Sequence, residues 1–189
     1  MPVSSLEETL CDADGLDLIL DRLTRDIVDA YGKETCVRLV GVRTRGVPIA
    51  ERLALRLREA TGHTVSVGAI DVTLYRDDLN TSPRWPVLRG TEIGFEVEGE
   101  QVILVDDVLY TGRTTRAALN VLLDLGRPAR VRLLTVIDRG HRELPIQADF
   151  TGMTVRTARE DRVLVQVQPI DPTDRVVLVR APGHQPRSV

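Results

Sequence analysis

The strongest constraint on the fold comes from residues 102–115, which have the sequence VILVDDVLYTGRTT. The first four residues are apolar and mostly β-branched, which is typical of a strand buried on both faces, and Asp106 and Asp107 follow them. A polar turn at residues 111–115 then leads into helical spacing of apolar residues over 116–125. The stretch therefore predicts a central strand that ends at two carboxylates, a short turn and a helix.

The chemistry of this stretch suits a ligand that carries both vicinal hydroxyls and a phosphate. Unpaired N–H groups at the start of a helix attract phosphate, and Gly112 would let the backbone approach it closely. Neighbouring carboxylates can accept hydrogen bonds from two hydroxyls. The stretch lacks the GxxxxGK[ST] and GxGxxG patterns of other nucleotide sites. It predicts a ribose 5-phosphate site, although paired acids alone are more often a solvated strand end or a helix cap.

Length and composition predict one domain with an ordinary globular core. The chain has 189 residues, of which 42% are hydrophobic and 28% charged. Only 3% are aromatic and the net charge is −3, so neither broad base-stacking platforms nor overall attraction to nucleic acid is expected. Two cysteines are too few for a disulfide framework, and Cys36 is expected to pack in the core. Without a signal-like start or a membrane-length apolar run, the chain is expected to be cytoplasmic, with no membrane contact.

The rest of the chain alternates between helix-like and strand-like patterns. Helical spacing is present at residues 16–31 and 49–61, and Asp12 or Asp14 can cap the first helix. Apolar runs predict strands, at residues 36–42, 64–75, 93–97, 101–106, 130–137, 163–168 and 176–179. This order predicts an α/β fold, with a mainly parallel, doubly wound sheet of five or six strands, helices on both faces and a small flap.

The turn after the strand predicted at 36–42 has a similar character. Two guanidiniums, a hydroxyl and a glycine precede a helix there, supplied by Arg43, Thr44, Arg45 and Gly46. Taken alone, these arginines would be ordinary exposed loop charges. Because the carboxyl ends of parallel strands meet at one edge of a sheet, we expect this turn to hold a second anionic group beside the first.

Two further loops carry predictions. Residues 79–92 are polar, contain prolines and lack periodicity, so they form either a passive connection or a flexible lid, and we favour a lid that shields a water-sensitive reaction. Residues 138–146 follow another predicted strand and belong at the same edge. His141 has no nucleophile or second metal ligand at a recognisable spacing, so we interpret it as a polar loop residue. The tail at 181–189 is expected to fray.

Three segments resemble one family. Residues 102–115 resemble the phosphoribosyl pyrophosphate (PRPP) motif of type I phosphoribosyltransferases. The segments DVTLYRDDL at 71–79 and DRGHRELPI at 138–146 narrow the resemblance to the PyrR family, whose members are bifunctional pyrimidine operon regulators with uracil phosphoribosyltransferase activity. The likeness extends over residues 16–179.

The resemblance implies an enzyme that converts uracil and PRPP to UMP and diphosphate. Asp106 and Asp107 are implied to grip the ribose hydroxyls, and the lid residue Arg76 to neutralise the departing pyrophosphate together with the turn at 43–46. The remaining PRPP contacts, above all to the 5-phosphate, are implied for Val108, Leu109, Tyr110, Thr111, Gly112, Arg113, Thr114 and Thr115. Uracil is implied to lie against Ile137, Asp138, Arg139 and Gly140. Magnesium is implied as the cofactor, held mainly through PRPP.

The resemblance also implies a regulatory activity. Family members bind pyr leader RNA on a basic face, and uridine nucleotides such as UMP and UTP favour that binding. The residues implied to take part here are Arg22, Arg25, Thr44, His141 and Arg142. Asp21, Gln147 and Met153 depart from the basic character expected of that face, and each missing phosphate contact weakens RNA binding. A homodimer or higher homo-oligomer is also implied.

Two alternatives stay open from the sequence. A purine-base phosphoribosyltransferase would share the PRPP elements, since the base pocket is the variable part. A non-catalytic, nucleotide-sensing RNA-binding regulator would keep the site only as a receptor. The presence of both carboxylates and of the arginine in the lid argues against this second alternative.

Overall fold

The computed structural model describes residues 7–32, 36–72 and 90–181. The lid residue Arg76, most of the lid predicted at 79–92 and nearly all of the predicted tail lie outside these ranges. Among the described residues, no helix is both long enough and apolar enough to cross a membrane.

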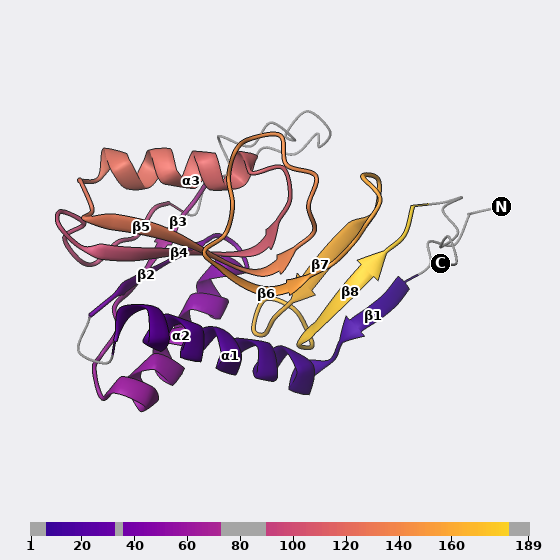
Figure 1. Cartoon of the computed structure of the whole chain (residues 1–189), viewed down its shortest axis with the longest axis horizontal. Helices are drawn as coiled ribbons and strands as arrows, with labels where there is room; N and C mark the ends of the chain where they lie inside the picture. The colour runs from indigo at the N-terminus through magenta and orange to yellow at the C-terminus, as the bar shows by residue number, and fades with distance from the viewer. Residues whose placement is uncertain (1–6, 33–35, 73–89, 182–189) are drawn as a thin grey trace.

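The main sheet has five parallel strands in the order β3-β2-β4-β5-β6. Its strands are β2 (Arg38–Val42), β3 (Val67–Ile70), β4 (Gln101–Leu109), β5 (Arg130–Asp138) and β6 (Phe150–Thr154). Helices α1 (Ala13–Tyr31) and α2 (Gly46–Thr61) cover one face, and α3 (Arg113–Asp124) covers the other (Figure 1). The predicted α/β architecture with a central strand at β4 is confirmed.

Burial on both faces explains the continuous apolar run of β4. Ile103 and Val105 belong to the core beneath α1 and α2, whereas Val102 and Leu104 pack in the core beneath α3. Because successive side chains of a strand point to opposite faces, a strand covered on both sides needs apolar residues at every position.

A second sheet has three antiparallel strands in the order β1-β8-β7 and lies beside the first (Figure 1). It contains β1 (Glu7–Cys11), β7 (Arg162–Gln166) and β8 (Arg175–Val179). Apolar patterning predicted two of these strands. It missed β1, which is largely exposed and has no alternation of apolar residues.

Three parts of the main sheet differ from the prediction for identifiable reasons. Strand β4 continues through both acids to Leu109, because β5 pairs with it along that whole length. Residues 93–97 form no strand, and an isolated antiparallel bridge joins Ala69 to Glu92 instead. Strand β6 was missed because Gly152 interrupts its pattern. A Cβ at Gly152 would lie 2.4 Å from the Val136 carbonyl oxygen, so close packing requires the glycine.

Candidate active site

One cleft of about 780 Å³ opens at the carboxyl edge of the main sheet, where β2, β4 and β5 end. It brings together the acid pair, the turn before α3 and the turn before α2, as the sequence predicted. The predicted residues that line it are Arg43, Thr44, Arg45, Asp106, Asp107, Val108, Leu109, Tyr110, Thr111, Gly112, Arg113, Thr114, Thr115 and Arg139. An opening of this size accommodates a nucleotide-sized ligand.

The acid pair is placed by the last residues of β4. Asp106 is only 6% exposed, and its Oδ1 accepts a hydrogen bond from the Asp107 N–H at 3.0 Å. Asp107 Oδ1 accepts one from the Val108 N–H at 2.9 Å, and the Asp107 carbonyl accepts one from the Thr135 hydroxyl. The first two bonds orient the carboxyl groups, and the third holds the backbone of β4 against β5.

The start of α3 has the features of an anion site. Gly112 caps the helix in a left-handed conformation with φ of 90°, and the Thr111 hydroxyl accepts a hydrogen bond from the Arg113 N–H at 3.3 Å. Thr115, in the first turn, is 2% exposed, and its hydroxyl has no hydrogen-bond partner among the described residues. A buried hydroxyl without a hydrogen-bond partner costs free energy, so a ligand that forms a hydrogen bond with it is favoured.

Each arginine of the turn before α2 is paired with a carboxylate. Arg43 contacts Glu92 at 2.9 Å, and Arg45 forms two hydrogen bonds to Asp171 at 2.9 and 2.8 Å. Hydrogen bonding to Asp171 raises the pKa of Arg45, and the same bonds lower the pKa of Asp171. The peptide bond between Arg43 and Thr44 is cis. The cleft is therefore lined by two arginines whose positive charges are partly balanced by Glu92 and Asp171, carboxylates that do not themselves line it.

Gly46 does not line the cleft but sets how closely the turn approaches the sheet. A Cβ at this position would lie 2.4 Å from the backbone oxygen of Val105 in β4. A side chain at this position would push the turn away from the acid-bearing strand, so their close approach requires the glycine.

The third predicted loop, at 138–146, reaches the cleft through Arg139 and Glu143. Arg139 is 7% exposed, its guanidinium stacks 4.1 Å from the centre of the Tyr110 ring, and it donates to the Ala158 carbonyl at 2.8 Å. Burial lowers the pKa of Arg139. Of the other predicted base-binding residues, none lines the cleft: Ile137 is fully buried, and Asp138 accepts a hydrogen bond from the Gly140 N–H.

Of the residues predicted to bind RNA, Thr44 lines the cleft, and the other four lie outside it in different settings. Arg22 and Arg25 are exposed on α1. His141 contacts the Thr157 carbonyl through Nε2 at 2.8 Å. The Arg142 guanidinium binds the Asp138 carboxylate and backbone carbonyls of neighbouring loops, those of Leu109, Tyr110, Gly140 and Ile146.

Sequence reasoning missed a whole wall of the cleft. Residues 159–164 line it, and Glu143, whose loop at 138–146 was predicted at this edge but whose own role was not, forms ion pairs with both Arg113 and Arg159. The available signal was the charged run RTAREDR at 156–162, which follows β6. Because β6 itself was not recognised, nothing in the sequence placed this run at the edge of the sheet.

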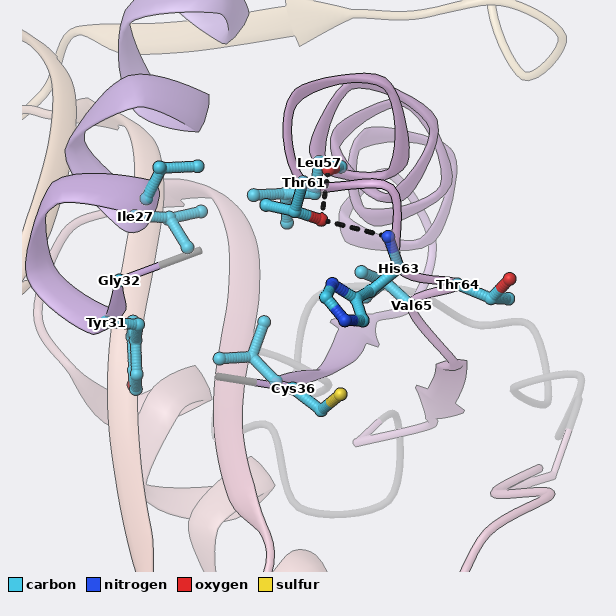
Figure 2. A pocket seen from close by; sticks show the side chains of 11 residues that line it. Ile27, Tyr31, Gly32, Cys36, Leu57, Thr61, His63, Thr64 and Val65 are labelled. Atoms are coloured by element: carbon cyan, nitrogen blue, oxygen red, sulfur yellow. Dashed lines mark hydrogen bonds between the residues drawn. The ribbon is translucent and has the colours of Figure 1, made fainter. Parts of the chain in front are cut away.

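A second pocket, of about 10 Å³, lies at the opposite edge of the sheet, where α1 and α2 end and β2 and β3 begin. Figure 2 shows its mostly apolar lining, with the Thr61 hydroxyl hydrogen-bonded to the Leu57 carbonyl and to the His63 N–H. Cys36 borders this pocket and is exposed, so the prediction that it packs in the core was wrong. The space holds about one water molecule and no larger ligand.

Comparison with known proteins agrees with the geometry. The phosphoribosyl transferase domain family matches residues 9–171. The bifunctional protein PyrR of Pelotomaculum thermopropionicum is 51% identical over 170 residues, which are 90% of this chain and 94% of that protein. The bifunctional protein PyrR of Thermus thermophilus is 50% identical over 164 residues, covering 87% and 91%.

Solved structures share the fold at much lower identity. A hypoxanthine phosphoribosyltransferase of Trypanosoma cruzi superposes with a TM-score of 0.70 at 18% identity, over 92% of this chain and 96% of that one. The sequence resemblance to PyrR is confirmed by the closer relatives. The chain belongs to the phosphoribosyl transferase domain family and, within it, to the bifunctional PyrR proteins.

Proposed function

We propose that this phosphoribosyltransferase couples uracil to PRPP, giving UMP and diphosphate, and also acts as a uridine-nucleotide-dependent RNA-binding regulator of pyrimidine synthesis by transcription attenuation. One observation carries the enzymatic part. The acid pair, the start of α3 and the arginine turn before α2 open on one cleft. A sugar bearing a phosphate and a pyrophosphate needs these three kinds of group on one surface.

The cleft suggests a role for each of its parts. Asp106 and Asp107 would accept hydrogen bonds from the ribose hydroxyls, and the first turn of α3, with the unsatisfied Thr115 hydroxyl, would hold the 5-phosphate. Arg43 to Gly46 would bind the pyrophosphate. Catalysis would then consist of orienting the two substrates and stabilising the charge that develops on the leaving group, without a covalent intermediate.

Magnesium would enter bound to PRPP. Mg²⁺ commonly uses one or two carboxylates together with substrate phosphates, and Asp106 and Asp107 are carboxylates that line the cleft. The residues that the structure describes contain no cluster of three or more His, Cys, Asp or Glu side chains suited to a metal. The substrate's oxygens would therefore supply most ligands, and the ion would neutralise pyrophosphate charge.

Base choice is tested by supplying PRPP with one base at a time and measuring nucleotide formation. Uracil should be the preferred base, on the strength of the PyrR-like segments at 71–79 and 138–146. Preference for hypoxanthine or guanine would show that the substrate is a purine base and not uracil. Absence of pyrophosphate release with every base would favour the non-catalytic regulator.

The lid remains part of the proposal although Arg76 lies outside the described residues. We expect Arg76→Ala to lower turnover at least tenfold while the fold stays intact, because less charge would be neutralised on the leaving pyrophosphate. Unchanged steady-state kinetics would remove this arginine from the mechanism.

The regulatory part is supported by the relatives' shared description as bifunctional and by the PyrR resemblance. Arg22 and Arg25 are exposed and can reach phosphates, whereas the Arg142 guanidinium is engaged within the protein. Titration of labelled pyr leader RNA at low and moderate salt, with and without UMP, should show a salt-sensitive complex that UMP strengthens. If UMP and salt have no effect, only the enzyme remains.

A further inference from the structure

Two arginine–aspartate pairs fasten the connection between β7 and β8 to helix α2 and to the turn before it. Arg45 bonds to Asp171 through Nε and Nη2 at 2.9 and 2.8 Å. Seven residues further along the chain, Arg52 bonds to Asp174 through Nη1 and Nη2 at 2.6 and 3.0 Å. Each pair is bidentate, the geometry that fixes a guanidinium most firmly.

Both aspartates are themselves anchored by the β7–β8 connection. Asp171 accepts a hydrogen bond from the Val167 N–H at 3.0 Å, and Asp174 accepts one from the Gln168 N–H at 2.7 Å. Their side chains are 10% and 17% exposed. The two pairs are thus near duplicates in chemistry, burial and attachment.

They differ in what the arginine faces. Arg45 lines the cleft, whereas Arg52 does not. Asp171 takes two of the five N–H donors of Arg45, which leaves three for a ligand. Asp171 itself is not among the cleft-lining residues, so it can act only through Arg45.

We infer that Asp171 is a positioning residue for pyrophosphate, holding the Arg45 guanidinium so that its free edge faces the leaving group. The inference rests on the proposed function, which assigns pyrophosphate to this turn. An arginine that is ordered before its ligand arrives loses less conformational entropy on binding. Asp171 thereby contributes to pyrophosphate affinity without touching it.

The hydrogen bonds between Asp171 and Arg45 are expected to persist when the ligand binds. Removing one partner from a largely buried ion pair leaves an uncompensated charge, which is strongly unfavourable. The bonds also lower the pKa of Asp171 and raise that of Arg45, so both stay charged at neutral pH. Pyrophosphate would therefore bind the remaining N–H groups of Arg45 without displacing the Asp171 carboxylate.

The test compares Asp171→Asn with Asp174→Asn, because both changes remove one charge from the same connection. Binding of pyrophosphate with magnesium is measured by calorimetry, KM for PRPP and kcat by steady-state kinetics, and Tm by thermal unfolding. We expect Asp171→Asn to weaken pyrophosphate binding about tenfold and to raise KM more than it lowers kcat. Asp174→Asn should lower Tm comparably and leave binding within about twofold.

The outcomes separate this inference from the function on which it rests. A wild-type protein that binds no pyrophosphate would overturn both. With wild-type binding intact, equal effects of the two variants, no effect of Asp171→Asn, or tighter binding by it would each overturn the positioning role alone. If Asp171→Asn does not fold, Asp171→Glu is measured instead: its longer side chain should displace Arg45 and weaken binding, and unchanged affinity would refute the inference.

Discussion

The pockets at the two edges of the main sheet differ sharply in size and polarity. The carboxyl edge carries a cleft of about 780 Å³ lined by arginines, acids and hydroxyls, whereas the amino edge carries a mostly apolar pocket of about 10 Å³. Among the described residues, no side chain lines both. The same five strands thus support a binding surface at one end and a closed packing surface at the other.

Helix polarity explains this difference. Helices α2 and α3 begin at the carboxyl edge, where their N-terminal N–H groups attract anions, while α1 and α2 end at the amino edge. The connections that enter the helices therefore hold the charged residues. At the amino edge, α1 and α2 are each followed by a glycine with positive φ, Gly32 and Gly62. Function is expected to respond to changes at the first edge and only stability to changes at the second.

The largest expected effect comes from Gly46→Ala at the carboxyl edge. Its methyl group would meet the Val105 backbone oxygen at 2.4 Å, and backbone cannot rotate away. We expect a loss of about 2–3 kcal/mol in unfolding free energy, measured in denaturant, together with weaker PRPP binding because the turn must move.

Gly62→Ala is the matched change at the amino edge. It introduces no contact within 4 Å and only strains a left-handed residue with φ of 78°, so about 1–2 kcal/mol and unchanged PRPP binding are expected. Equal losses of both stability and affinity in the two variants would remove the distinction between the edges.

A smaller effect, on ligand capture alone, is expected from Asp107→Asn. The amide is isosteric but replaces one acceptor oxygen by a donor, so PRPP affinity should fall about tenfold or more, as measured by calorimetry. Thr61→Val serves as the control at the amino edge, because its hydroxyl bonds only Leu57 and His63 in the described structure. Unaltered PRPP affinity in Asp107→Asn would refute the assignment of the ribose hydroxyls to this acid.

Lowering the pH should weaken the two ion pairs that hold the β7–β8 connection, Arg45–Asp171 and Arg52–Asp174. The pKa values of Asp171 and Asp174 are lowered by their arginines, so their stabilising effect is complete above the unfolded-state pKa of about 4 and is lost as the pH falls through the lower folded-state values. The difference in unfolding free energy between wild type and the Asp171→Asn, Asp174→Asn double variant should narrow from pH 6 to pH 3. A constant difference would show that charge is not what these pairs contribute.

The sequence predicted what local chemistry determines. The apolar run before Asp106 and the hydroxyl-rich turn at 111–115 were sufficient to predict a central strand, a helix start and a shared edge with the turn at 43–46. These predictions succeeded because burial on both faces and helix polarity are properties of short segments.

What the sequence did not predict depends on distant partners. Asp171 lies 126 positions from Arg45, and no local pattern links the two. Strand β6 was hidden because Gly152 is needed for packing against β5 and α1, and with it the wall at 159–164 was missed. Burial of Cys36 was inferred from the apolar residues after it, yet the strand begins only at Arg38.

The smallest expected effect concerns Cys36, which is exposed beside the amino-edge pocket. A maleimide at pH 7 should modify Cys36 before Cys11, because Cys11 is partly buried and burial raises its pKa, which lowers its reactive thiolate fraction. Peptide mass spectrometry measures the order of labelling, and Cys36→Ser is the unlabelled control. Turnover and KM for PRPP should stay within about twofold, since no cleft residue borders this pocket. Activity that falls in step with labelling of Cys36, and not in the serine variant, would show that the two edges are coupled through the sheet.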